Sequence, residues 1–198
     1  MMSGENEVQR LLEERNGYLT AKEAREHGVS NTVLRRMTER GQIERISHGL
    51  YVGADVIPDA FMLAQYRCPK GIFSHETALF LHDLCDRSPF RLTMTIPSGS
   101  GSRILKEKDF QFFYCKPELI NLYIETVQTP SGVTVSAYDK ERTLCDCLRQ
   151  IDKLDRDLVL SAVKQYMASP ERDNAKLLRC AEVFKIRAGI RSYMEVLS

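Results

Sequence analysis

Two short helical segments separated by a glycine, and followed by two short strands, occupy residues 20–53 and most constrain the fold of this chain. Thr20 is followed three residues later by Glu23, which is the spacing of a capping box at a helix start. Gly28 can adopt the positive φ that a tight break between two helices needs. We expect the second helix to end at Gly41, because glycine often terminates helices. The pattern predicts a helix-turn-helix.

An amphipathic helix precedes this pattern, with apolar residues at i, i+3 and i+4 on one face: Val8, Leu11 and Leu12. Residues 43–46 and 50–52 read as short strands with alternating apolar side chains, joined by a tight turn. Helices followed by such a hairpin predict a winged helix-turn-helix domain, which we place in residues 1–54.

Residues 55–198 predict a larger domain that combines a sheet with helices. Helical patterns at about 58–67 and 75–85 precede four runs rich in β-branched and aromatic residues: 90–96, 110–114, 122–127 and 133–137. From Asp139 onward the spacing is helical again. The predicted fold class is therefore α+β, with an N-terminal winged helix-turn-helix followed by a larger C-terminal domain of a mixed β-sheet flanked by helices.

The composition indicates a soluble cytoplasmic protein without a cofactor. No stretch approaches the roughly 18 apolar residues of a membrane span, and no secretory signal is visible. The six cysteines form no Cys-x-x-Cys pair, so we expect reduced thiols, mostly in the core, and no metal site: Cys68, Cys85, Cys115, Cys145, Cys147 and Cys180.

The helix expected to follow the N-cap residue Ser30 has an apolar side and a polar side. Its apolar side carries three residues: Val33, Leu34 and Met37. Its polar side carries Asn31, Thr32, Arg35, Arg36 and Glu39. Arginine can bind O6 and N7 of guanine, and asparagine can bind N6 and N7 of adenine. This side therefore predicts contact with the major groove of DNA.

The predicted DNA-binding residues lie on this helix and on the following hairpin: Ser30, Asn31, Thr32, Arg35, Arg36, Arg40, Arg45 and His48. The chain has 28 basic and 27 acidic residues, and residues 20–53 hold six basic against four acidic residues. One copy would neutralise few phosphates, so we expect salt-sensitive binding by two copies on paired half-sites. A module that docks a partner protein through the same helix is the alternative interpretation.

A family resemblance covers roughly residues 15–195. The segment GYLTAKEAREHGVSNTVLRRMTERGQIERISHGLYV resembles the winged helix of AbiEi-type antitoxins, the antitoxin and repressor components of type IV toxin–antitoxin (abortive infection) systems. The later segments FSHETALFLHDLCDR and VSAYDKERTLCDCLR are similar to the same family. The recognition helix is less basic than is common in that family, because Glu39 and Glu44 lie beside the arginines.

The resemblance implies two tasks for the chain. The N-terminal domain would bind inverted repeats in its own promoter and repress its own operon. The C-terminal domain would neutralise a toxin of the nucleotidyltransferase type, with or without a stable complex. Two further family motifs carry no known chemical role, and we expect them to be structural: Ser74, His75, Glu76 and Thr77, and Asp139, Arg142, Thr143 and Asp146.

A metal-dependent enzyme is the third interpretation, because His75 and His82 lie seven residues apart on one expected helix face. The spacing of a metalloprotease is absent, since Leu79 stands where the second histidine is needed. We therefore predict no catalytic residues. Arg142 and Asp146 are spaced i, i+4, which predicts either an ordinary helix pair or a buried guanidinium that ties helix to sheet.

Overall fold

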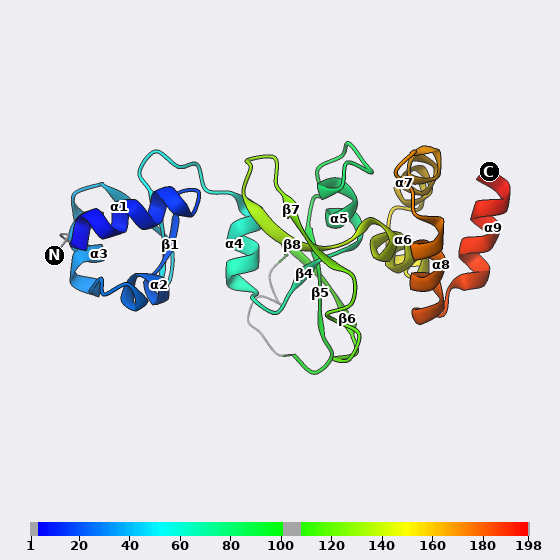
Figure 1. Cartoon of the computed structure of the whole chain (residues 1–198), viewed down its shortest axis with the longest axis horizontal. Helices are drawn as coiled ribbons and strands as arrows, with labels where there is room; N and C mark the ends of the chain where they lie inside the picture. The colour runs from blue at the N-terminus through cyan, green and yellow to red at the C-terminus, as the bar shows by residue number, and fades with distance from the viewer. Residues whose placement is uncertain (1–3, 101–107, 198) are drawn as a thin grey trace. The chain divides into compact units, whose positions relative to one another are not determined.

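The computed structural model describes residues 4–100 and 108–197 of the 198-residue chain. It divides into two compact units, Met1–Asp59 and Ala60–Ser198 (Figure 1). The predicted division of the chain into domains of 1–54 and 55–198, each with its own task, stays a prediction.

The N-terminal unit contains, in chain order, α1 (Gly4–Glu14), β1 (Tyr18–Thr20), α2 (Ala21–Glu26), α3 (Asn31–Glu39), β2 (Ile43–Ser47) and β3 (Leu50–Gly53). The strands form an antiparallel sheet in the order β1-β3-β2. The predicted helices and the hairpin are present. Strand β1, which pairs with β3, was not predicted, because three residues are too short to show a periodic pattern.

Local signals fix the helix ends of this unit. The capping box at α2 is complete, because the Thr20 side chain accepts from the backbone of Glu23 and the Glu23 carboxylate accepts from that of Thr20. Gly28 and Gly41 have φ values of 77° and 69°, which glycine adopts without strain. The helices then pack around one apolar cluster: Val8, Leu11, Leu12, Leu19, Ala24, Val29, Leu34, Met37 and Ile43.

The C-terminal unit begins with α4 (Ala60–Arg67), β4 (Ile72–Phe73), α5 (His75–Leu81), β5 (Leu92–Pro97), β6 (Phe110–Cys115), β7 (Ile124–Gln128) and β8 (Thr134–Tyr138). It continues with α6 (Lys140–Arg149), the short 3-10 helix η2 (Ile151–Lys153), α7 (Arg156–Ala168), α8 (Asn174–Val183) and α9 (Arg187–Leu197). The α+β class predicted from the sequence is therefore confirmed.

The sheet of this unit has the strand order β6-β5-β4-β8-β7. Strand β4 is antiparallel to β5 and parallel to β8, so the sheet is mixed, as predicted. Strand β4 is only two residues long and was not expected from the sequence, although it is the central strand that joins the two halves of the sheet.

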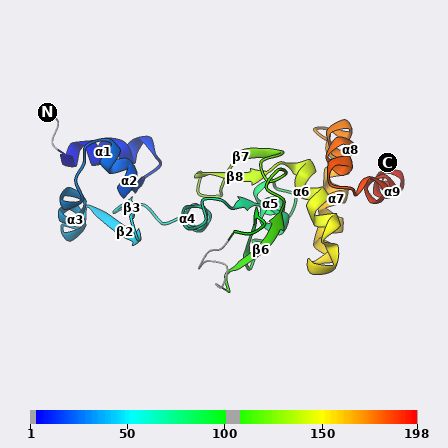
Figure 2. The ribbon, with the colours of Figure 1, turned by 90° about the horizontal axis from the view of Figure 1, so that it is seen from below.

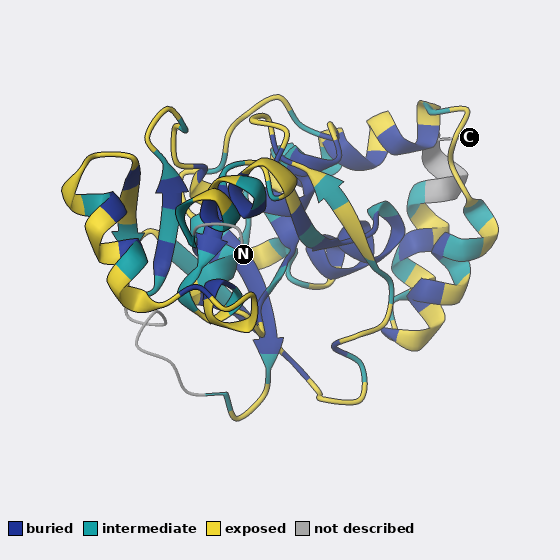
Figure 3. Ribbon diagram, turned by 60° about the vertical axis from the view of Figure 1, so that its left-hand side comes forward, coloured by how far each residue is buried: buried dark blue, intermediate teal, exposed yellow. Residues whose placement is uncertain are grey.

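Helices pack against this sheet from the beginning and from the end of the C-terminal unit. Helix α4 packs on β8, and α5 packs on β5 and also on α6. Figure 2 shows α7, α8 and α9 gathered around α6, on the side of the sheet away from α4. Buried residues, dark blue in Figure 3, follow the strands and the inner helix faces, whereas most loops are exposed.

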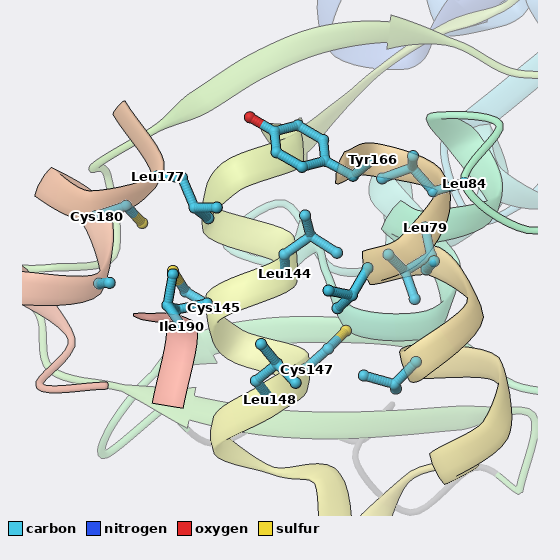
Figure 4. Packing of buried hydrophobic residues seen from close by; sticks show 14 of the residues in the cluster. Leu79, Leu84, Leu144, Cys145, Cys147, Leu148, Tyr166, Leu177, Cys180 and Ile190 are labelled. Atoms are coloured by element: carbon cyan, nitrogen blue, oxygen red, sulfur yellow. The ribbon is translucent and has the colours of Figure 1, made fainter. Parts of the chain in front are cut away.

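The main apolar cluster of this unit surrounds α6, whose buried side chains meet those of its neighbouring helices (Figure 4). Leu144 and Leu148 of α6 belong to it, together with Tyr166 of α7 and Cys180 of α8. The six cysteines are free thiols, and Cys85 alone among them is not fully buried, in agreement with the sequence analysis. Within the described residues, no helix is both long and apolar enough to cross a membrane.

Candidate nucleic-acid interface

Helix α3 is oriented as the sequence predicts. Leu34 and Met37 are fully buried against the other elements of the N-terminal unit. Asn31, Thr32 and Arg35 are exposed on the opposite side. The polar side of α3 is therefore available to a large ligand.

A groove of about 450 Å³ lies between this polar side and the hairpin. Asn31 and Arg35 line it from α3, and Arg45 and His48 line it from β2 and the turn that follows. These four belong to the predicted DNA-binding set, so the structure brings them to one surface. Arg25 of α2 lines the same groove, although the sequence analysis did not include it among the binding residues.

The contacts of Arg35 and Arg45 in the groove are exposed. Arg35 Nε lies 3.4 Å from Glu39 Oε1, and the two side chains are 76% and 65% exposed. Arg45 Nη2 lies 3.0 Å from His48 Nδ1, and Arg45 Nε donates to the carbonyl of Ser47 at 3.3 Å. Exposed contacts of this kind contribute about 0–1 kcal/mol, so a phosphate group can replace them.

The structure separates Arg36 and Arg40 from this groove. Arg36 Nη2 lies 2.7 Å and Arg40 Nη1 lies 3.2 Å from the same oxygen, Glu5 Oε1, on helix α1. The predicted binding set is therefore divided between two edges of α3. This division was not predictable from the sequence, because Glu5 meets α3 only through the packing of α1 against it.

The remaining predicted residues lie at the N-terminus of α3. Ser30 occupies the N-cap position with extended backbone, and Thr32 follows in the first turn. Among the described residues, the Ser30 side chain makes no capping hydrogen bond, and it is exposed. Hydroxyl groups and backbone N–H groups at a helix start suit phosphate oxygens.

The sequence carries only a partial signal for Arg25. It lies in a short helix whose start is fixed by the capping box, and Ala24 beside it is the residue that packs inward. A polar residue next to that buried position must face outward, toward the turn of the hairpin. The signal was present, but it requires the packing of α2 to be interpreted.

The family motif around His75 is structural in its contacts. The His75 ring stacks on Phe113 with ring centroids 3.7 Å apart, and its Nδ1 lies 2.9 Å from Ser74 Oγ. Burial, helped by the nearby cationic Arg149 and Arg142, lowers the pKa of His75 to about 3. The ring is therefore neutral and packed between helix and sheet.

His82 has different partners from His75. It follows the last turn of α5, and its Nε2 lies 2.7 Å from the carbonyl oxygen of Tyr138 and 3.4 Å from Glu125 Oε1. No group of three His, Cys, Asp or Glu side chains in the part of the chain that the structure describes could hold a metal ion. His75 and His82 therefore do not converge on a shared metal site within the described residues.

Arg142 combines both roles predicted for it. Its Nε donates to Asp146 Oδ2 at 2.6 Å, and both side chains are almost fully buried. Its guanidinium also lies 4.2 Å from the Tyr138 ring centroid and 3.6 Å from that of Phe184. The pair therefore stabilises α6 and ties it to the sheet and to the end of α8.

The N-terminal unit is a winged helix-turn-helix, since an exposed polar helix follows the turn and an antiparallel hairpin follows that helix. Residues 6–52 match the family of transcriptional regulators described as AbiEi antitoxins. The resemblance predicted from the sequence is thus confirmed over these residues.

The fold of the whole chain is similar to a crystal structure of the RV2827C protein from Mycobacterium tuberculosis. The TM-score is 0.56 at 12% sequence identity, and the match covers 95% of this chain and 79% of the other. No curated protein matches the sequence. At this identity the similarity shows a shared fold, which extends through both units.

Proposed function

We propose that this chain is a DNA-binding antitoxin that represses its own operon through the winged helix. The groove between α3 and the hairpin carries the proposal, because it gathers Arg25, Arg35 and Arg45 with Asn31 on one exposed surface. The match of residues 6–52 to regulators of the AbiEi antitoxin family supports the same assignment.

In this proposal α3 enters the major groove with its N-terminal half. Arg35 and Asn31 are the base-reading residues, since their side chains can each make paired hydrogen bonds with a purine. Ser30 and Thr32 bind phosphate at the start of α3. Arg45 and His48 follow the flanking backbone from the hairpin, and Arg25 does so from α2.

Useful affinity for DNA requires two copies of the chain. One unit neutralises only a few phosphates, so a single half-site is bound weakly at physiological salt. Two chains on inverted repeats combine two such contacts, as in other dimeric helix-turn-helix proteins. We therefore propose inverted repeats in the promoter of the chain's own operon as the binding site, which places the protein in the cytoplasm.

The C-terminal unit would act on the toxin. Its supporting observation is the family description, which names an antitoxin, together with the SHETA and Asp139–Asp146 motifs that resemble the family. The partner that this resemblance implies is a toxin of the nucleotidyltransferase type. No enzymatic step is assigned to the chain itself.

Substitution of Arg35 and Arg36 by alanine tests the DNA assignment. The double variant should lose binding to a duplex from upstream of the gene, because it removes a base contact and a basic charge from α3. Arg179→Ala/Arg191→Ala is the matched control, since both residues are exposed on helices of the C-terminal unit. Unchanged affinity of the α3 variant would show that the reading helix is wrongly assigned.

The same variants separate the two tasks. The Arg35→Ala/Arg36→Ala protein should still protect cells that express the toxin encoded beside it, since these substitutions leave the C-terminal unit intact. If instead the winged helix docks a partner protein, duplex binding should be weak and equal for all sequences. Loss of a partner complex in the double variant would then identify the docking surface.

A further inference from the structure

Glu5 of α1 holds two arginines of the recognition helix. A single oxygen, Oε1, contacts Arg36 Nη2 at 2.7 Å and Arg40 Nη1 at 3.2 Å. The Glu5 side chain is 24% exposed, whereas the two arginines are 49% and 55% exposed. The carboxylate is thus the more buried member, and the arginines reach toward it from α3.

The position of Glu5 favours its negative charge. It lies in the first turn of α1, where the helix dipole stabilises an anion. Helix α1 is fixed against α3 by Val8 and Leu11, which are fully buried in the apolar cluster of the unit. Glu5 therefore stays at this edge of α3 when DNA approaches.

The charges of the three side chains do not cancel. Two guanidinium groups and one carboxylate leave a net charge of +1 where α3 alone would present +2. A phosphate must compete with Glu5 for Arg36 and Arg40, and it also meets the carboxylate itself. Among the described residues, no acidic side chain pairs with Arg25 or Arg45, and the acidic partner of Arg35 is the exposed Glu39 of its own helix. The restraint by a residue of α1 is therefore confined to the edge of α3 that carries Arg36 and Arg40.

We propose that Glu5 sets the sequence-independent part of DNA affinity by restraining Arg36 and Arg40, and so leaves discrimination to Asn31 and Arg35. This inference rests on the proposed function. Phosphate contacts raise affinity for every duplex and carry no sequence information. Restraint of two basic residues therefore weakens binding to unrelated DNA without loss of base readout.

Glu5→Gln tests the proposal, because glutamine keeps the size of the side chain and removes its charge. We expect tighter binding to the upstream duplex by about tenfold at roughly 50 mM salt and about threefold at roughly 200 mM, which is the gain of about one phosphate contact. A scrambled duplex should gain by the same factors, so the ratio of the two affinities should not change.

Glu14→Gln is the matched control. Glu14 is also an ion-paired glutamate of α1, but its partner is Arg10 on the same helix, away from α3. The Glu14→Gln variant removes the same charge but frees no arginine of α3. Its affinity for DNA should therefore stay near that of the unmodified protein. In an Arg36→Gln/Arg40→Gln background, Glu5→Gln should give no gain, because the restrained residues are absent.

Two results overturn the inference while leaving the proposed function in place. Glu5→Gln could bind DNA no better than Glu14→Gln, or it could bind more weakly, which would make Glu5 a support that orients Arg36. Glu5→Ala should repeat the gain, and thermal melting of each variant checks that the fold is intact. Equal binding of the upstream and scrambled duplexes by the unmodified protein would instead overturn the proposed function.

Discussion

Two arginine–carboxylate pairs in this chain have the same helical spacing and opposite environments. Arg35 and Glu39 on α3 lie 3.4 Å apart and are 76% and 65% exposed. Arg142 and Asp146 on α6 lie 2.6 Å apart and are 0% and 1% exposed. Arg35 can exchange its carboxylate partner for a phosphate group, whereas the buried Arg142 cannot reach a ligand.

Burial therefore decides what the shared spacing means. An exposed pair contributes little to stability, because water screens both charges. A buried pair lets the chain tolerate two charges in its core, and removal of one partner leaves the other without compensation. On α3 the arginine is available for function, and on α6 it is part of the architecture.

Arg142→Met should have the largest effect of the substitutions considered. It leaves Asp146 buried, with Arg149 as its remaining cationic partner at 2.9 Å. We expect a loss of about 3–5 kcal/mol in the free energy of unfolding, measured by urea titration. Arg35→Met, the exposed counterpart, should change it by less than about 0.5 kcal/mol.

Replacement of both members of the buried pair sharpens this test. Arg142→Met/Asp146→Leu also removes the Asp146 carboxylate, which has lost its buried partner in Arg142→Met. The double variant should therefore recover part of the stability lost in the single variant. A double variant that is less stable than the single variant would contradict this account, because it would show that the Asp146 carboxylate still stabilises the fold through Arg149 when Arg142 is absent.

Arg35, whose substitution should hardly change stability, should matter most when DNA binding is measured with Arg35→Ala. Loss of one paired contact with a base costs about 1–3 kcal/mol, so affinity for the upstream duplex should fall about 10- to 100-fold. Affinity for a scrambled duplex should fall much less. An equal decrease for both duplexes would make Arg35 a phosphate contact and leave the base-reading role unfilled.

The buried His75 predicts a pH dependence of the protein's stability. The pKa of His75 in the folded protein is about 3, below its usual value of 6.5. Between these two pH values the unfolded chain therefore binds a proton on this histidine that the folded protein does not bind. Stability should therefore fall as pH decreases through 6.5, by about 1 kcal/mol between pH 7 and pH 5.5.

His75→Asn is the variant that isolates this effect. Asparagine tolerates the positive φ of 49° at this position and does not titrate. Its unfolding free energy should depend less steeply on pH between these two values than that of the unmodified protein. Identical slopes in the two proteins would contradict the buried neutral histidine.

The smallest expected effect compares two helix caps in the N-terminal unit. Thr20→Ala removes the capping box of α2 and should cost about 1 kcal/mol in stability. Ser30→Ala at the start of α3 should cost less, because the Ser30 side chain makes no capping bond within the described structure. Urea unfolding measures both, and a larger loss for Ser30→Ala would contradict a free hydroxyl at the start of α3.

Residues with strong local signals were predictable from the sequence. The capping box at Thr20, the turn at Gly28 and the apolar side of α3 all depend on neighbours within one or two helical turns. Strands β1 and β4 were missed because short strands are defined by their partners. Glu5 was missed for a related reason, since only the packing of α1 brings it to Arg36.

Arg142 lies between these cases. Its spacing to Asp146 predicted a pair, but nothing in the local sequence shows that Tyr138 and Phe184 enclose the guanidinium. The candidate site was likewise predicted as a set of residues on one helix and one hairpin. Their division between a groove and the Glu5 contact is a property of tertiary structure alone.

The most direct test of the DNA assignment is fluorescence anisotropy with the duplex from upstream of the gene. A scrambled duplex serves as control, and both are measured with the full chain at roughly 50 and 200 mM salt, because binding through phosphates weakens as salt rises. We predict tighter binding to the upstream duplex at both salt concentrations, with affinity that falls at the higher one. Weak and equal binding to both duplexes would contradict the assignment of α3 and the hairpin as a DNA-reading surface.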